Sequence, residues 1–193
     1  GSEMCIRDSY TPFKDVDVHL LRYGEETGRR VYERTLQFIL IAAVRRLFPA
    51  ARVQVRYSLG PGLYITIEKD PALTEQDVLR LESEMRLIIR AALPLERRRL
   101  SIDEAIAFFE KDGQLDKARL LKWRKFSYFD VYCLGDYKDY FYGEMAPGTE
   151  YADVFRLKFM DGAVIMLMPR KDEPDVPSEY TDMTKLASVF RQS

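Results

Sequence analysis

The most hydrophobic stretch of this chain lies inside a segment with the features of a helix. Residues 38–44 are continuously apolar within the segment Arg30–Phe48, which carries Arg45 and Arg46 near its end and is followed by Pro49. A helix that is apolar on nearly all sides is usually buried, and proline ends a helix because it lacks a backbone N–H. The pattern therefore predicts a buried helix over residues 30–48.

Two strands and a second helix are predicted next. Residues 52–57 and 63–68 alternate apolar and polar side chains, and a glycine-rich turn separates them. Thr74 followed by Asp77 is typical of a helix N-terminus, where the side chains cap exposed backbone N–H groups. The helix that follows presents one apolar face, made of Val78, Leu81, Met85, Ile88, Ile89 and Ala92. This is the clearest amphipathic helix in the chain.

Beyond Pro94, short helices give way to strands rich in tyrosine, phenylalanine, valine and methionine. We expect an arginine-bearing strand, two helices and four further strands, over residues 95–100, 101–113, 114–124, 129–134, 137–142, 154–159 and 163–168. Asp161-Gly162 is a hairpin turn sequence, so the last two strands pair. A polar, proline-bearing linker over residues 172–177 and a short helix over residues 182–190 complete the expectation.

These elements predict an α+β domain in which an antiparallel sheet packs against the long buried helix and further helices. The chain has 193 residues, of which 47% are hydrophobic, enough for a substantial core. The Gly1-Ser2 start is typical of a tag scar, so residues 1–9 are set aside. We expect residues 10–29 to be a linker or the remnant of a preceding domain.

Overall charge gives no indication of a polyanionic partner. The chain has 30 lysine and arginine residues and 31 aspartate and glutamate residues, which gives a formal net charge of −1. Any basic binding site must therefore be local. Only two cysteines are present, Cys5 and Cys133, as is usual in a reducing compartment. With no apolar stretch near the roughly 20 residues of a membrane-spanning helix, we expect a cytoplasmic protein without membrane contact.

Catalytic motifs are hard to find. His19 is the one histidine, and a zinc hydrolase usually draws on several histidines or cysteines held close together. Cys133 lies in an aromatic strand without a histidine to activate it, so an inert core thiol is the expectation. Gly60-Pro61-Gly62 lacks the lysine of a phosphate-binding loop and leads into a strand. We therefore expect no catalytic residue, no metal and no cofactor in this chain.

Two features are candidates for ligand binding. Arg97 and Arg99 fall on one face of the expected strand, where two guanidinium groups can hold a phosphate or carboxylate. More often such a run of arginines is simply solvated. Tyr140, Phe141 and Tyr142 concentrate aromatic rings beside a glycine, where they can stack on a base or can simply be core packing.

The helix and hairpin sequences resemble a known family. Residues 34–40, Leu47-Phe48-Pro49, the hairpin over residues 60–68 and the cap at residues 73–78 are similar to the second additional domain of threonyl-tRNA synthetase, its editing module. Residues 101–109 and 140–149 continue the match, which covers residues 30–168. The resemblance implies the fold of that domain.

It does not imply that domain's chemistry. In the family, two histidines four residues apart on the first helix and a Cys-x-x-x-His segment surround the site that removes misattached serine. The matching positions of this chain carry Arg34, Phe38, Phe141 and Met145. Because none of these is a histidine or cysteine, the resemblance implies loss of the metal-dependent editing site.

A closer resemblance is to the version of this domain that precedes the P-loop domain of bacterial nucleoside (uridine) kinase-like proteins. Residues 28–34, 139–147, 169–170 and 185–190 carry it. It implies a parent that uses ATP and Mg²⁺, with a C-terminal P-loop kinase domain in the same polypeptide as partner. Residues 30–170 are then the editing-like domain, and residues 171–193 lead toward the kinase domain.

Three hypotheses follow. The first is an accessory sensing or interaction module whose pocket, lined by Arg34, Phe38, Phe141 and Met145, takes a nucleoside or nucleotide. The second is a tRNA- or RNA-binding domain that uses Arg97, Arg99 and nearby lysines. The third is an ester hydrolase with a metal-free site, which lacks a histidine or cysteine pair to activate water.

Overall fold

The computed structural model describes residues 26–60, 62–123, 128–135, 137–139, 144–170 and 173–177. Several sequence-based expectations lie outside these residues: Cys5, His19, Tyr140, Phe141, Tyr142 and the helix over residues 182–190. Within the described ranges, antiparallel sheets pack with helices around a long buried helix, which confirms the α+β class. No helix in this part of the chain combines the length and apolar character needed to cross a membrane.

The long helix α3 (Glu26–Leu47) begins four residues earlier than predicted. Glu26 and Arg30 form an i,i+4 ion pair at 2.6 Å, which supports an additional first turn. At the other end the N–H of Phe48 donates to the Val44 carbonyl, and Pro49 follows. The buried residues of α3 are Thr35, Leu36, Phe38, Ile39, Leu40, Ala42, Ala43 and Val44. The predicted buried helix is confirmed.

Four strands form the main antiparallel sheet, in the order β1-β2-β7-β6. Their bounds are β1 (Arg52–Leu59), β2 (Gly62–Glu68), β6 (Arg156–Met160) and β7 (Ala163–Leu167). Asp161 and Gly162 join β6 to β7 with backbone φ angles of 51° and 80°. Both angles lie in the left-handed region, as a type I′ hairpin turn requires, so the predicted hairpin is confirmed.

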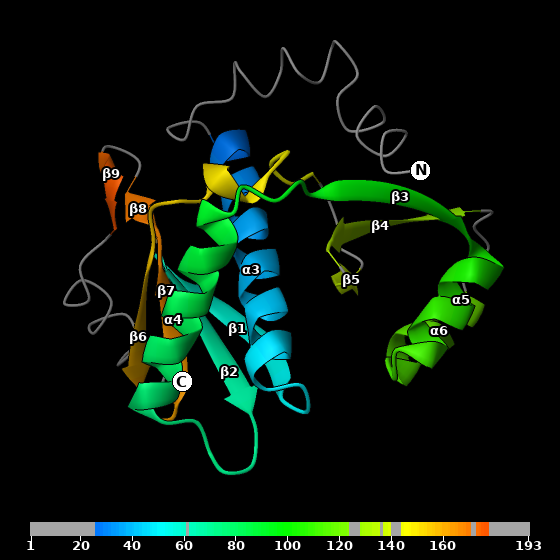
Figure 1. The fold of residues 1–193 in the computed structure, drawn as a ribbon, viewed down its shortest axis with the longest axis horizontal. Coiled ribbons are helices and arrows are strands. Elements are labelled where there is room, and N and C mark those ends of the chain that lie inside the picture. The colour runs from blue at the N-terminus through cyan, green and yellow to red at the C-terminus, as the bar shows by residue number, and fades with distance from the viewer. Residues whose placement is uncertain are drawn as a thin grey trace.

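Strand β7, inside this sheet, is buried on both faces. Along β7, Val164 and Met166 belong to the main core with α3, whereas Ile165 and Leu167 belong to a second apolar cluster. This separation follows from the alternation of side chains along a strand. Figure 1 shows α3 and α4 packed side by side against one face of the sheet.

The amphipathic helix α4 (Glu75–Arg90) has the predicted cap. The Thr74 hydroxyl accepts from the Asp77 N–H at 3.1 Å, and the Asp77 carboxylate accepts from the Thr74 N–H at 3.1 Å. Hydrogen bonds from Thr74 and Lys69 lower the pKa of Asp77, although desolvation, the largest effect, acts in the opposite direction. The capping box thus defines where α4 starts.

A second, smaller sheet projects beside α3 in the order β3-β4-β5. It consists of β3 (Glu96–Ser101), β4 (Tyr128–Leu134) and β5 (Tyr137–Asp139). Helices α5 (Ile102–Lys111) and α6 (Leu115–Lys122) pack together, and α5 also packs on β3 and β4. The predicted cap is present, since the Ser101 hydroxyl accepts from the Glu104 N–H at 3.1 Å.

Strand β4 links two cores because its side chains alternate. Tyr132 and Leu134 join the main core, while Phe129, Val131 and Cys133 join a separate cluster with α5 and α6. Cys133 is buried there, as expected for a core thiol. We call the unit formed by α5, α6 and the chain between them the helical lobe.

Two boundaries near the C-terminal side differ from the prediction. Strand β6 begins at Arg156 and not at Val154, because the N–H and carbonyl of Val154 are both hydrogen-bonded to the Tyr32 hydroxyl. Within the segment predicted as a linker, residues 172–177, the structure has a strand that was not predicted. This strand is β9 (Glu173–Pro177), which pairs antiparallel with β8 (Pro169–Arg170). Proline is tolerated in such a two-stranded ribbon because each strand needs to donate on only one side.

Candidate functional site

One face of α3 packs against the second sheet, where Phe38 contacts Tyr132 and Tyr137. Arg34, Phe38, Ile41 and Arg45 recur at spacings of four, three and four residues, which places them in one row along the helix. The first two lie at the positions matched to the metal site in the family resemblance. The last two lie one to two turns further on, and the two halves of the row have different surroundings.

The half around Phe38 is filled with aromatic rings. The Phe38 side chain is fully buried, and its ring centroid lies 4.9 Å from that of Tyr137 and 6.4 Å from that of Tyr132. Both spacings are in the range of favourable aromatic pairs. We call Phe38, Tyr132 and Tyr137 the aromatic cluster. It occupies the helix face where a metal ligand would have to project.

Residues 144–146 close this half from the other side. Arg34 Nη1 donates to the Glu144 carbonyl at 3.3 Å, and the Ala146 N–H donates to Thr35 Oγ1 at 2.8 Å. The Met145 side chain is buried in the same core as Phe38. Three of the four sequence-predicted pocket residues therefore do come together, but as packing and backbone contacts. The fourth, Phe141, lies outside the described residues.

The side chains at this position are poor metal ligands. An arginine guanidinium is always protonated and only donates, and a phenyl ring offers no lone pair. The thioether of Met145 is a soft ligand and does not suit a hydrolytic zinc site by itself. Among the described residues, no three His, Cys, Asp or Glu side chains are grouped so as to hold a metal ion.

Tyr132 is held in its neutral form. Burial raises the pKa of its hydroxyl, and this effect outweighs the opposing influence of Arg97 and of a hydrogen bond with the Met145 backbone. A neutral, hydrogen-bonded phenol in a packed core is a structural element with no proton to exchange near neutral pH.

The half around Arg45 is an open cleft of about 580 Å³. It lies between the C-terminal part of α3, the start of β1, the chain joining α5 to α6, and β5. We call it the cleft. Its lining residues are Ile41, Val44, Arg45, Ala51, Arg52, Val53, Gly113, Gln114, Leu115, Asp116, Lys117, Tyr137 and Asp139. A volume of this order accommodates a small organic molecule.

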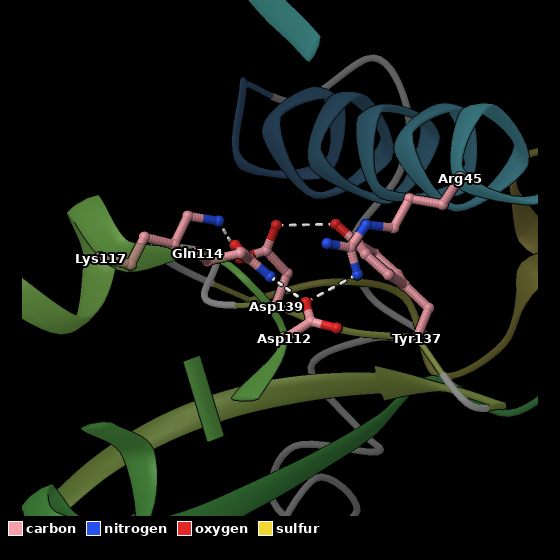
Figure 2. A network of polar contacts seen from close by, with 6 residues as sticks. All are labelled: Arg45, Asp112, Gln114, Lys117, Tyr137 and Asp139. Atoms are coloured by element: carbon pink, nitrogen blue, oxygen red, sulfur yellow. Dashed lines mark hydrogen bonds and ion pairs between the residues drawn. The ribbon is translucent and has the colours of Figure 1, made fainter. Parts of the chain in front are cut away.

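A buried carboxylate lies at one wall of the cleft. Asp139 is only 6% exposed, and it accepts a hydrogen bond from the Tyr137 hydroxyl at 2.7 Å while pairing with Lys117 (Figure 2). Burial raises the pKa of Tyr137 well above its usual value, and the neighbouring Asp139 carboxylate raises it further. Tyr137 therefore remains a neutral donor to Asp139, and the lysine balances the buried charge.

A second set of polar side chains, Arg45, Asp112 and Gln114, lies near the Tyr137–Asp139 pair. Arg45 Nη1 lies 2.7 Å from Asp112 Oδ2, and Gln114 Nε2 donates to the same oxygen at 2.6 Å. The Arg45 guanidinium also lies 5.4 Å from the centroid of the Tyr137 ring. Figure 2 shows these side chains converging from α3, the helical lobe and β5. Arg45 is thus held between an aromatic face and a carboxylate.

The anion site predicted at Arg97 and Arg99 lies on β3 and does not line the cleft. Arg97 and Arg99 do share a face of β3, opposite Tyr132 and Asp130 on β4. Arg99 Nε donates to Asp130 Oδ1 at 3.1 Å, and its guanidinium lies 4.0 Å from the Tyr128 ring centroid. Arg97 interacts with Tyr132. Both arginines are therefore engaged by their own sheet. Tyr140 and Tyr142 lie outside the described residues.

Three residues of the cleft were not singled out from the sequence: Arg45, Lys117 and Asp139. Tyr137 begins the aromatic segment that was considered for stacking on a base. Arg45 was noted only as a basic residue in the last turn of a helix, and a lysine on a short amphipathic helix is usually solvated. The one usable signal was the row of spacings from Arg34 to Arg45, which places Arg45 on the same helix face as Phe38.

Comparison with known proteins gives a consistent family of relatives. The chain is 31% identical over 151 residues to a threonine–tRNA ligase of Symbiobacterium thermophilum, 30% over 148 residues to that of Carboxydothermus hydrogenoformans, and 33% over 136 residues to that of Nitratidesulfovibrio vulgaris. These matches cover 78%, 76% and 70% of this chain. No known family profile matches the chain.

The matched segment is a small part of each relative. It spans 23% of the first two ligases and 21% of the third. The similarity therefore concerns one domain and not a whole ligase. Together with the antiparallel sheets and the long buried helix, it supports a threonyl-tRNA synthetase-like, editing-domain-like fold for this chain.

Proposed function

We propose that this chain is a non-hydrolytic ligand-binding domain that has kept the editing-type fold and lost its metal-dependent chemistry. In this proposal it serves as the accessory domain of an ATP-dependent nucleoside (uridine) kinase-like protein. Its ligand, a nucleoside or nucleotide, binds in the cleft. ATP and Mg²⁺ belong to the kinase domain of the same polypeptide.

The observation that carries the first part is the packing of Phe38. Its ring is fully buried between Tyr132 and Tyr137, so a water molecule activated by a metal has no room at this turn of α3. A general base for ester hydrolysis would need an accessible group that takes up a proton near neutral pH. Neither buried tyrosine provides one, because burial raises the pKa of both.

The cleft supplies what a small polar ligand needs. Ile41, Val44 and Val53 provide apolar surface, and the polar groups of Arg45, Lys117 and Asp139 converge on the same space. A carboxylate has about four lone-pair positions, so Asp139 can accept from a ligand hydroxyl in addition to Tyr137 and Lys117. Ligand pockets commonly combine an apolar wall with a few convergent polar groups in this way.

The kinase context rests on the sequence resemblance over residues 28–34, 139–147, 169–170 and 185–190. The ligases matched by the chain are about four times its matched length, so activity and partners of a whole protein do not transfer from them. The decisive observation is the encoding gene. A Gly-x-x-x-x-Gly-Lys-Ser/Thr motif downstream in the same reading frame supports the proposal, and a different neighbouring domain contradicts it.

The binding function is tested by calorimetric titration with uridine and uridine 5′-monophosphate. Ile41→Trp places a large ring on the wall of the cleft and should abolish binding of both compounds. Leu87→Trp is the matched control, because Leu87 is exposed on α4 away from the cleft. Unchanged binding by Ile41→Trp, or no binding by the unaltered protein, contradicts the proposal.

A hydrolysis assay and an RNA-binding assay test the alternatives. The protein should leave seryl-tRNA intact under conditions in which an active editing domain cleaves it. The similarity to tRNA ligases keeps a tRNA-binding role as the second candidate. That role requires tRNA affinity that falls steeply with salt and falls further in Arg97→Gln/Arg99→Gln. Such a result, with no nucleoside binding, replaces the first proposal by the second.

A further inference from the structure

Two arginines of the cleft are paired with aspartates of the helical lobe. Arg45 on α3 lies 2.7 Å from Asp112, and Arg52 at the start of β1 lies 3.5 Å from Asp116. Both arginines line the cleft. These two pairs therefore join the body of the domain to the lobe across the rim of the same opening.

The lobe has its own support and does not need these pairs to fold. Ala105, Phe109, Ala118 and Leu121 form an apolar cluster with residues of β4. By contrast, Arg52 and Asp116 have side chains that are 65% and 78% exposed, and the Arg45 and Asp112 side chains are also partly exposed. Ion pairs in contact with water contribute little to stability and exchange partners readily.

Each aspartate keeps a second stabilising contact if its arginine leaves. Asp112 also accepts from Gln114 Nε2 at 2.6 Å. Asp116 lies in the first turn of α6, where the helix dipole favours negative charge. Releasing the arginines therefore leaves neither carboxylate as an isolated charge.

We propose that Arg45 and Arg52 form an anion-exchange site at the rim of the cleft, where the phosphate of a bound phosphate monoester displaces Asp112 and Asp116 and releases the chain between α5 and α6. The proposal rests on the ligand-binding function of the cleft and adds the anionic class of ligand and a conformational response. Guanidinium groups bind phosphate oxygens in paired, charge-assisted hydrogen bonds. The ring of Tyr137 keeps the Arg45 guanidinium at the wall of the cleft during the exchange.

The direct test uses inorganic phosphate and hydrogen exchange of the backbone amides of residues 112–117. At matched ionic strength, phosphate should speed exchange of these amides in the unaltered protein, whereas chloride should not. Asp112→Asn/Asp116→Asn should exchange fast without phosphate and bind phosphate at least about threefold more tightly, because the competing carboxylates are gone. Arg45→Gln/Arg52→Gln should show fast exchange and no response to phosphate.

The matched control is Arg46→Gln/Glu84→Gln, which removes an ion pair of 3.3 Å outside the cleft. It should behave as the unaltered protein. Equal effects of phosphate and chloride, or unchanged phosphate affinity in Asp112→Asn/Asp116→Asn, overturn the exchange site. Uridine, which has no phosphate, separates the two proposals. If uridine binds but phosphate has no specific effect, the cleft function stands and the exchange site fails.

Discussion

Two stretches of the same helix face have opposite characters. At Phe38, whose side chain is fully buried, α3 meets the packed aromatic cluster, while at Arg45, two turns on, it borders an open cleft with charged walls. Tyr137 belongs to both, since its ring packs on Phe38 and its hydroxyl donates to Asp139. A single side chain thus separates a closed region from an open one.

The difference shows that a closed core and an open, charged cleft can lie along one face of the same helix. Phe38 and Met145 extend the core into one half of the face. The other half keeps a buried carboxylate, a lysine and an arginine, which are costly to retain without a partner. The chain has paired each of them internally, through Asp139 with Lys117 and Arg45 with Asp112.

The largest expected effect on the free energy of unfolding is in the aromatic cluster around Phe38. Phe38→Ala should lower the free energy of unfolding by about 3–5 kcal/mol, since it removes a fully buried ring and leaves a cavity against Tyr132 and Tyr137. Urea denaturation followed by circular dichroism measures this. Leu87→Ala, at an exposed position of α4, should change stability by less than about 0.5 kcal/mol. A loss at Phe38 as small as this would mean that the region is not packed as described.

The next effect concerns the buried carboxylate of the cleft. Asp139→Ala should destabilise the protein by about 1–3 kcal/mol, because the Tyr137 hydroxyl loses its acceptor in a buried position. Asp139→Asn keeps an acceptor oxygen and should recover part of this loss. Equal stability of the alanine and asparagine variants would show that the hydrogen bond is not what holds the wall of the cleft.

A smaller, pH-dependent effect on the free energy of unfolding is expected at Tyr137, the residue that contacts both Phe38 and Asp139. A tyrosine in the unfolded chain ionises near pH 10, whereas burial, followed by the Asp139 charge, raises the pKa of Tyr137 in the folded state. The neutral phenol therefore contributes stability that is present below about pH 10 and declines as the pH rises further. Tyr137→Phe cannot ionise, so its stability should fall less steeply across this range.

Denaturation series from neutral pH to above pH 10 provide the measurement. Some alkaline decline should persist in Tyr137→Phe, because burial also raises the pKa of Tyr132. Parallel curves for the variant and the unaltered protein would contradict the assignment of the decline to Tyr137.

The smallest effect on stability is expected at the charged rim. Arg45→Gln should cost about 0.2–1 kcal/mol at low salt, and the difference should shrink as salt screens the partly exposed pair with Asp112. Arg46→Gln, which breaks the pair with Glu84, is the matched control. The two variants should agree in stability and differ in ligand binding. Equal binding by both would remove Arg45 from the site.

Local features of the sequence predicted the elements well. The cap at Thr74 and Asp77, the cap at Ser101, the Asp161-Gly162 turn and the end of α3 before Pro49 all appear in the structure. Each depends on atoms a few residues apart, so the pattern contains the physical cause. The strand within residues 172–177 was not predicted, because its pairing with residues 169–170 depends on a partner and not on local propensity.

The order of apolar and polar positions predicted the fold class, and the residue types at Arg34, Phe38 and Met145 excluded a histidine- or cysteine-based metal set there. They could not determine which turn of α3 is closed and which is open. That depended on the tertiary structure, because Phe38 meets Tyr132 and Tyr137, and Arg45 meets Asp112, across long separations in the chain. Contacts of this kind arise only when the second sheet and the helical lobe pack beside the helix.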